Sequence, residues 1–469
     1  MRHAVALCFL VPFFAFAAGR VIAADGSLDP TFGNGGVAYV SPDDVGAREI
    51  TAVAAVQLAD GKLLFGGARN KILEGFPVYE PQIRGALVRL QADDSVDATF
   101  GNTSITGLVE LPDLAATRMQ SIESMAVLDD GSILAAGTSM VDGPLAGFVV
   151  RLHADGSLDT LFGNGGSVLY PGTYLHAIAV DGEGRVLAAG EHVDTSTLVY
   201  TSTVVRLLPD GSPDASFGSG GKVTLAWSDA TLSGYLSALA VTPADGLVVG
   251  GGFEANGSGL GTQFALARLD ANGAPDPAFA GTGWRVFADP AGNSIVNTVQ
   301  RLVLLEDGRI VFAGIHTAGE NITGLMLGRV LADGGDDATF GDVATPGYFT
   351  PAVLQDAESV NATALLRQPD GKLLVSANFY GPPEHMFALR ATADGALDTS
   401  FGAQGVFDYD AAGGGPWSEA GTMALQRDGR IVIAGRAMRS ADSPIVDFAA
   451  VRLENAQVPT DRVFADGFD

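Results

Sequence analysis

The chain has 469 residues and a formal net charge of −27, from 54 acidic and 27 basic side chains. This excess of carboxylates argues against nucleic-acid binding, which needs clustered Lys and Arg for phosphate contacts. With 47% apolar residues and 62 glycines, the composition excludes a disordered chain and is typical of a dense β protein with many tight turns.

Residues 1–24 have the pattern of a secretory signal peptide. A short basic start precedes an apolar run over residues 4–18, and small residues follow it. The run is shorter than the roughly 20 residues that a membrane span needs. We expect cleavage before Asp25, a periplasmic, surface or secreted location, and no membrane insertion of the mature chain. Because Cys8 is the only cysteine, the mature chain would contain no thiol.

The motif Asp-x-x-Phe recurs along the whole mature chain. Successive copies are 55 to 68 residues apart, so one supersecondary unit is repeated with small insertions and deletions. The phenylalanines of the seven copies are Phe32, Phe100, Phe162, Phe217, Phe279, Phe340 and Phe401.

Each repeat contains four apolar stretches of strand length, bounded by turn residues. In the first copy they cover residues 50–58, 62–68, 85–90 and 105–110. Between the first and second stretch, pairs such as Asp60-Gly61 predict a two-residue hairpin turn in which both residues have positive φ. The third copy has the residues Asp-Gly-Glu-Gly at 181–184, which predict a longer turn.

Four antiparallel strands repeated seven times predict an all-β fold, a seven-bladed β-propeller, with an open solenoid as the competing architecture. The mature chain begins with a lone fourth-strand segment and ends with a unit that lacks one. If residues 37–40 complete the last blade, the ring closes and no raw strand edge remains. We therefore predict a single domain over residues 25–455, followed by a C-terminal tail over residues 456–469.

The repeat resembles a known family. Residues 60–67, 86–90 and 156–166 are similar to the delta-60 repeat of bacterial exported and surface proteins, and the likeness recurs in seven registers over nearly the whole mature chain. The resemblance implies a propeller-like β fold and implies no reaction. Residues 463–469 are similar to short C-terminal tails of other exported proteobacterial proteins, which leaves a solvated end and a sorting role as alternatives.

The Asp of the motif and an Arg at the end of each third strand occur in all seven copies. A staple inside each blade explains every copy at once, whereas a catalytic residue would be needed only once. Calcium is the alternative, but one carboxylate per copy falls short of the six or more oxygens that calcium binds. We therefore expect no cofactor, with calcium as a weak alternative, and no metal site.

The loops that depart from the repeat are expected to carry the function. An insertion over residues 69–84 holds Arg69, Phe76 and Tyr79, aromatic and charged side chains that suit either a binding site or a packed flap. Trp417 is near acidic residues of the same predicted face, where it could stack on a sugar ring or pack between blades.

Two histidines follow the second strands of the third and fifth copies. His192 and His316 are expected at equivalent positions, with Glu254 in the copy between them. A His-Glu-His metal site is conceivable, and solvated rim residues are the alternative.

Motifs of known propeller enzymes are absent from the sequence. We therefore predict an exported, non-enzymatic and monomeric propeller that binds a glycan or a protein partner. A carbohydrate-active hydrolase or lyase and a structural surface-layer component are the alternatives.

Overall fold

The computed structural model describes residues 24–41, 47–72, 81–103, 105–114, 119–140, 145–225, 227, 233–254, 262–287, 294–318, 322–352, 360–379, 385–409, 418–438 and 445–455. Within these ranges the regular secondary structure is entirely β. None of the described residues belongs to a helix of the length and apolarity needed to span a bilayer.

Each repeat of the sequence forms one unit of four strands. The units are unit 1, β2 (Ala47–Gln57), β3 (Leu63–Ile72), β4 (Pro81–Leu90) and β5 (Leu108–Glu110); unit 2, β6 (Met119–Val127), β7 (Ile133–Met140), β8 (Ala146–Leu152) and β9 (Ser167–Pro171); unit 3, β10 (Thr173–Val180), β11 (Val186–Asp194), β12 (Val199–Leu207) and β13 (Lys222–Thr224); unit 4, β14 (Gly234–Val241), β15 (Leu247–Phe253), β16 (Gln263–Leu269) and β17 (Trp284–Phe287); unit 5, β18 (Ser294–Leu304), β19 (Ile310–Ala318), β20 (Ile322–Val330) and β21 (Tyr348–Phe349); unit 6, β22 (Val360–Arg367), β23 (Leu373–Phe379), β24 (Met386–Ala391) and β25 (Val406–Tyr409); unit 7, β26 (Ser418–Leu425), β27 (Ile431–Ala437), β28 (Asp447–Leu453) and β1 (Val37–Val40).

The described strands form five four-stranded sheets and one eight-stranded sheet. Units 1 and 2 make up the eight-stranded sheet, and a single parallel pair, Ile83 with Met119, joins β4 to β6. Every other named strand pair is antiparallel, as expected for strands that follow one another through short turns. This confirms the predicted all-β fold built from four-stranded antiparallel units.

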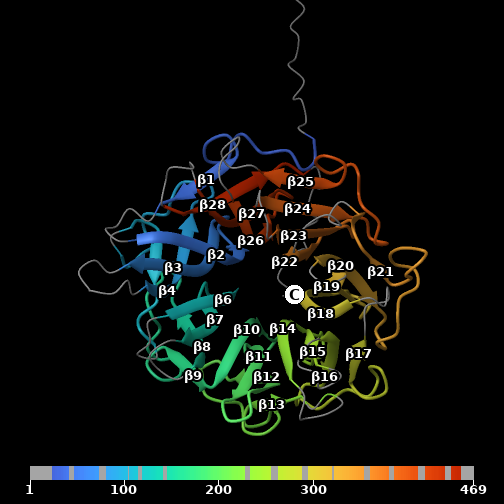
Figure 1. The fold of residues 1–469 in the computed structure, drawn as a ribbon. Coiled ribbons are helices and arrows are strands. Elements are labelled where there is room, and N and C mark those ends of the chain that lie inside the picture. The colour runs from blue at the N-terminus through green and yellow to red at the C-terminus, as the bar shows by residue number, and fades with distance from the viewer. Residues whose placement is uncertain are drawn as a thin grey trace, which may run out of the picture.

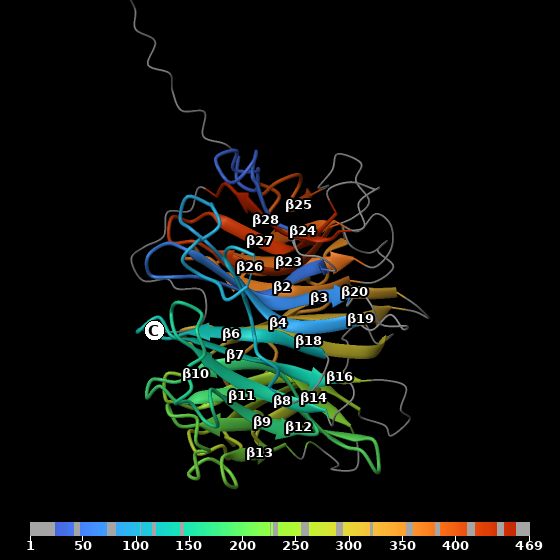
Figure 2. The ribbon, with the colours of Figure 1, turned by 90° about the vertical axis from the view of Figure 1, so that its left-hand side faces the viewer.

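Figure 1 shows the units arranged radially around a common axis, in chain order. The first strand of each unit lies nearest the axis, and the fourth lies at the rim. The edge-on view in Figure 2 shows the strands running roughly along that axis. The innermost strands are β2, β6, β10, β14, β18, β22 and β26.

The core lies between neighbouring sheets. One cluster joins unit 7 to unit 1 and includes Phe32, Ile50, Phe65 and Phe448, all essentially inaccessible to solvent. The rings of Phe65 and Phe448 are 4.9 Å apart between centroids. The phenylalanine of the Asp-x-x-Phe motif is buried in all seven copies, so it belongs to the packing between sheets.

The turn between the first and second strands differs from the prediction. In unit 1 the Gly61 amide donates to the Leu58 carbonyl, and of the two turn residues only Gly61 has positive φ, while the Asp60 carboxylate accepts an amide two residues on. The predicted two-residue turn is therefore wrong, and the loop is a three-residue hairpin that ends in a left-handed glycine. The longer turn predicted in unit 3 is also wrong, because Asp181 occupies the position of Leu58 and Gly184 takes the left-handed position.

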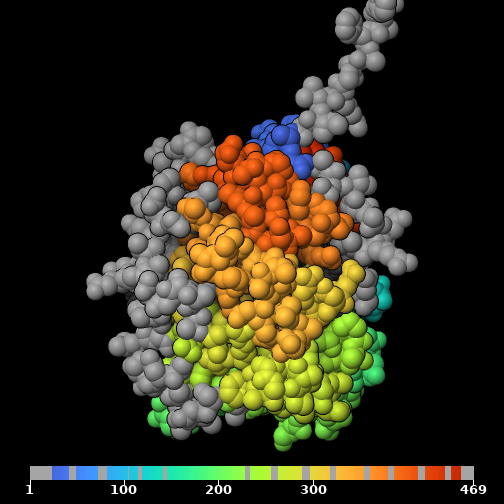
Figure 3. All heavy atoms as spheres, turned by 90° about the vertical axis from the view of Figure 1, so that its right-hand side faces the viewer, coloured from blue at the N-terminus to red at the C-terminus, as the bar shows by residue number. Residues whose placement is uncertain are grey.

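The last unit takes its outer strand from the start of the chain. Strand β1 pairs with β28 in an antiparallel register that runs from Val37 opposite Val451 to Val40 opposite Phe448. Figure 3 shows this N-terminal segment, in blue, packed against the orange and red atoms of the last units.

The two ends of the described chain also build one turn together. In unit 3 a continuous turn is closed by two hydrogen bonds, from Leu208 N to Ser212 O and from Gly211 N to Leu208 O, both 2.8 Å. In unit 7 the same two bonds run from Glu454 N to Ser27 O at 2.8 Å and from Gly26 N to Glu454 O at 2.7 Å. Residues 25 and 455 therefore take successive positions of a turn that is unbroken elsewhere.

A buried acid occupies the corresponding turn of unit 1. Asp94 adopts a left-handed conformation, with φ of 73°, where the other units have glycine. Its carboxylate accepts a hydrogen bond from Arg452 Nη1 at 2.9 Å, and the residue is 8% exposed. Burial, opposed by the charge of Arg452 and assisted by Asp29 and Asp93, raises the pKa of Asp94 to about 6.

Replacing Asp94 with Asn should change how stability depends on pH. An acid whose pKa is higher in the folded state favours the fold while it is protonated, and this contribution is lost as the pH rises from 3.8 through about 6. A shift of this size corresponds to about 3 kcal/mol. The free energy of unfolding would be measured with urea at about pH 4 and about pH 8. Relative to the wild type, that of Asp94→Asn should be higher at pH 8 than at pH 4 by up to this amount. An equal difference at both pH values would contradict the assignment.

Candidate functional site

The rim of every unit carries the same arginine staple. In unit 3, Arg206 Nε donates to Asp214 Oδ2 at 2.8 Å, and the guanidinium lies 4.6 Å from the centroid of the Phe217 ring. The equivalent sets are Arg89, Asp97 and Phe100; Arg151, Asp159 and Phe162; Arg268, Asp276 and Phe279; Arg329, Asp337 and Phe340; Arg390, Asp398 and Phe401; and Arg452, Asp29 and Phe32.

Each staple also reaches the next unit. Arg206 Nη1 donates to the Ala271 carbonyl of unit 4, and Arg329 Nη1 donates to the Ala393 carbonyl of unit 6 at 2.6 Å. The pKa of Asp214 is lower than that of a free aspartate. Burial acts to raise it, but the hydrogen bonds from Ser216 and the charge of Arg206 have the larger effect. The repeated Arg and Asp form a staple inside each unit, as the sequence predicts, and the same Arg also bonds to the next unit, which the sequence does not predict.

The axis of the ring is built differently. Each innermost strand has a β-bulge at the same place, where one residue is skipped in the pairing with the second strand. The skipped residues share a level of the ring but no side-chain type, and we call them the axial ring. They are Val53, Glu123, His176, Ser237, Gln300, Thr363 and Gly421.

The positions two residues earlier form a second polar level. Tyr174 of this level stacks on His176, with the rings 6.1 Å apart and 8° from parallel. Across both levels only Val53 and Gly421 lack a polar side chain, so the axial wall can offer many hydrogen bonds. The residues of the second level are Thr51, Ser121, Tyr174, Tyr235, Thr298, Asn361 and Glu419.

An arginine directly follows the axial ring in unit 5. Arg301 Nε donates to the Thr363 carbonyl at 2.9 Å, and Nη1 donates to the Gln300 carbonyl at 2.8 Å, so the guanidinium lies between two axial-ring residues. Burial lowers the pKa of Arg301, and the charge of Glu123 acts in the opposite direction. Among the described residues, no carboxylate lies within ion-pair distance of this guanidinium.

A histidine and a carboxylate pair up in unit 3. His176 Nε2 lies 3.1 Å from Glu191 Oε1. Burial lowers the pKa of His176, but the hydrogen bond and charge of Glu191, with the charge of Glu123, outweigh burial and raise the pKa above 6.5. The other oxygen, Glu191 Oε2, is buried and has no hydrogen-bond partner among the described residues.

These charges meet across the axis. Glu123 lies in unit 2, His176 in unit 3 and Arg301 in unit 5. The charge of Glu123 raises the pKa of His176, and the charge of Arg301 lowers it. The innermost strands that carry these three residues, β6, β10 and β18, lie around the same axis (Figure 1). The axial ring therefore holds Glu123 and His176, with Arg301 next to it along β18 and Glu191 bonded to His176 from β11.

The sequence holds a signal for this site that loop comparison misses. Each axial-ring residue stands seven positions before the second residue of the three-residue first turn, so Val53 precedes Asp60 and Gln300 precedes Asp307 by the same count. In the next column Arg301 replaces residues that are small in every other copy. Those residues are Ala54, Ser124, Ala177, Ala238, Ala364 and Thr422.

A family comparison supports the architecture. Five segments match the family model described as "Domain of unknown function (DUF5122) beta-propeller", over residues 58–100, 128–162, 184–217, 244–279 and 368–401. The chain is a β-propeller repeat protein. No curated protein matches the sequence.

Solved structures similar to the propeller share little sequence with it. A protein of unknown function from Dyadobacter fermentans is 17% identical, with a TM-score of 0.42, over 75% of this chain and 98% of its own. The protein Sqt1 from Chaetomium thermophilum is 13% identical, with a TM-score of 0.44, over 92% of this chain and 98% of its own. An α-L-arabinofuranosidase from Fusarium graminearum is 11% identical, with a TM-score of 0.42, over 90% of this chain and 97% of its own.

Of the loop residues Arg69, Phe76, Tyr79 and Trp417, the structure describes only Arg69. Arg69 is fully buried in the propeller and pairs with Glu110 of the outer strand β5. Phe76, Tyr79 and Trp417 lie outside the described residues.

The two histidines occupy equivalent places but do not meet. His192 pairs in register with Thr173 and His316 with Asn297, each three residues before an axial-ring residue. The predicted equivalence of Glu254 is wrong by one residue, because Phe253 holds this position in unit 4. The described part of the propeller contains no group of three or more His, Cys, Asp or Glu side chains that could hold a metal.

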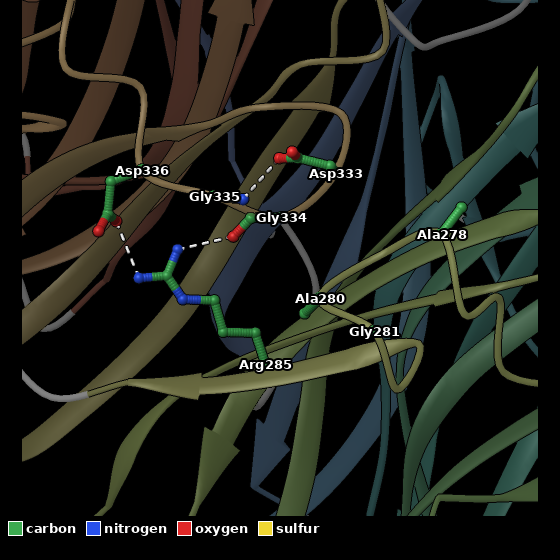
Figure 4. A pocket seen from close by; sticks show the side chains of 8 residues that line it. All are labelled: Ala278, Ala280, Gly281, Arg285, Asp333, Gly334, Gly335 and Asp336. Atoms are coloured by element: carbon green, nitrogen blue, oxygen red, sulfur yellow. Dashed lines mark hydrogen bonds and ion pairs between the residues drawn. The ribbon is translucent and has the colours of Figure 1, made fainter.

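A shallow hollow of about 580 Å³ lies where units 4 and 5 meet at the rim (Figure 4). Arg285 crosses it and donates to the Gly334 carbonyl at 2.7 Å and to Asp336 Oδ1 at 2.9 Å. Tyr348 donates to the same Asp336 oxygen at 2.8 Å. Since these polar groups bond to one another, they join units 4 and 5. Arg285 therefore offers a control substitution away from the axial ring.

Proposed function

We propose that the protein is an exported, monomeric binding module that holds a small polar ligand in the axial ring and catalyses no reaction on it. The proposal includes a closed ring of seven blades, with β1 completing the last blade, and a delta-60 type repeat. The pairing of β1 with β28 and the turn shared by residues 25 and 455 support closure. The signal-peptide pattern of residues 1–24 supports export, and cleavage before Asp25 would leave the turn position of Asp25 intact.

The contrast between rim and axis carries the proposal. Seven equivalent rim positions hold the same Arg and Asp, as a structural role requires. Seven equivalent axial positions hold seven different residues, and these include Glu123 and His176. Packing alone gives no reason for this polar variety, because four of the seven units have alanine at the position that follows, whereas an asymmetric ligand needs a different partner on each side.

A carbohydrate-active hydrolase or lyase is the second candidate. The pair of His176 and Glu191, with Glu123 acting across the axis, could supply a proton donor and an acceptor. A structural surface-layer role is the third candidate, and it would leave the axial ring without a ligand.

Substitution at the axial ring tests the proposal. A panel of mono- and oligosaccharides and small polar metabolites would be screened against the wild type by calorimetry, with product analysis for turnover. We expect a ligand whose affinity falls at least about tenfold in Glu191→Gln, because the buried carboxylate loses its charge and its bond to His176. Glu306→Gln, at a side chain that is 93% exposed, is the matched control and should bind normally.

The outcomes separate the candidates. Binding that Glu191→Gln leaves unchanged would refute the axial site. Turnover of a bound sugar would favour the hydrolase or lyase. Ordered assemblies without any ligand would favour the surface-layer role.

A further inference from the structure

We infer that the ligand of the axial ring carries a carboxylate on a hydroxylated skeleton, as a sugar acid does. The inference rests on the proposed function and specifies the chemistry of its ligand. Arg301, Glu191 and the stacked pair of Tyr174 and His176 carry the argument.

Arg301 is a partly exposed cation that has no carboxylate within ion-pair distance among the described residues. Two of its nitrogens donate to the carbonyls of Thr363 and Gln300, which orient the guanidinium, and the charge of Glu123 acts on its pKa. A guanidinium that is held in this way can form an ion pair with an anionic ligand. A carboxylate is a geometric match for a guanidinium, because the two can form parallel hydrogen bonds.

The fold itself does not require an arginine here. Six units place alanine, serine or threonine in this column, and Ala177 and Ala238 are buried there without any charge. The arginines that do hold the fold together are paired. Arg206 meets Asp214 at 2.8 Å, and Arg285 meets Asp336 at 2.9 Å. Since no carboxylate of the described residues lies within ion-pair distance of Arg301, its guanidinium is available for a ligand.

The rest of the wall argues against a bare inorganic anion. Glu123 and Glu191 would repel a small anion that had nothing else to offer, but both can accept hydrogen bonds from hydroxyl groups. Glu191 Oε2 is a buried acceptor without a partner among the described residues. The stacked rings of Tyr174 and His176 add a flat face of the kind on which a sugar ring packs.

A matched pair of sugars tests the inference. D-glucuronate and D-glucose share a pyranose ring and differ in whether carbon 6 is a carboxylate. Calorimetry with wild-type protein at about pH 7 should show glucuronate binding at least about tenfold more tightly than glucose, and acetate binding no better than glucose. Arg301→Gln should remove the preference for glucuronate, while Arg285→Gln, an arginine substitution at the rim, should keep it.

Arg301→Lys guards against a folding defect, because it retains the charge and should retain part of the preference. Equal binding of glucuronate and glucose by the wild type would overturn the inference and leave the proposed function standing. Equal binding of acetate and glucuronate would overturn it in favour of an unspecific anion site. Binding of neither sugar nor any oligosaccharide of either kind would overturn both the inference and the proposed function.

Discussion

Deleting residues 25–40 should leave a chain that cannot form a stable folded monomer. The deletion removes β1, the buried Phe32, and Asp29, whose carboxylate accepts a hydrogen bond from Arg452 Nε at 2.7 Å. Loss of a buried phenylalanine costs about 3–5 kcal/mol, and leaving Arg452 without its partner costs a similar amount. Together these losses equal most of the 5–15 kcal/mol by which a typical domain is stable. Circular dichroism and gel filtration would report an unfolded or aggregated protein.

A circular permutant provides the matched control for this deletion. Joining Asn455 directly to Asp25 and opening the chain between Ala154 and Asp155 moves the break to the same place in another turn, because these pairs are equivalent. The permutant keeps every residue of the ring and should fold with nearly unchanged stability. A deletion protein that unfolds with the wild-type midpoint would show that β1 does not hold the last unit.

Arg206→Met should be among the most destabilising single substitutions in the chain. The methionine keeps apolar contact with Phe217 but leaves the carboxylate of Asp214 buried without its arginine, and removes the bond to unit 4. Breaking a buried ion pair from one side typically costs about 3–5 kcal/mol. Urea unfolding monitored by circular dichroism would measure the loss.

An exposed arginine shows what burial contributes to that cost. Arg367 pairs with Glu306 at 3.5 Å, and their side chains are 37% and 93% exposed, so Arg367→Met should cost at most about 1 kcal/mol. Equal losses in the two variants would refute a structural role for the staple. Because hydrogen bonds lower the pKa of Asp214, the staple should also weaken in acid, as the pH falls below 3.8 toward the folded-state pKa.

The repeat predicts the architecture well, because its information is spread over seven copies. Strand number, strand order within a unit, and the burial of residues such as Phe162 follow from short apolar stretches between turn residues. The type of the turn between the first and second strands does not follow from the sequence. Asp-Gly suits both a two-residue and a three-residue hairpin, and the hydrogen bond from Gly61 to Leu58 distinguishes them only in the structure.

The site was harder to predict than the fold. Sequence reasoning favoured loops, where variation is obvious, and so selected Arg69, which proves to be an ion-pair partner of Glu110 inside the blade. A bulge cannot be read from one strand, since it depends on which residue of the neighbouring strand is skipped. That the charges of Glu123 and Arg301 act on each other depends on how units 2 and 5 are arranged around the axis, which one sequence does not give.

Because residues 25 and 455 build one turn together, the last unit can be completed only after both ends of the ring have been synthesised. Strand β1 is among the first parts of the ring to be synthesised, and its partner β28 is the last, so β1 has an unpaired edge while all the other strands are made. An unpaired edge can recruit a strand from another chain. With four residues, β1 offers such a partner only a short ladder, and the nascent chain reaches β28 with its first strand still available.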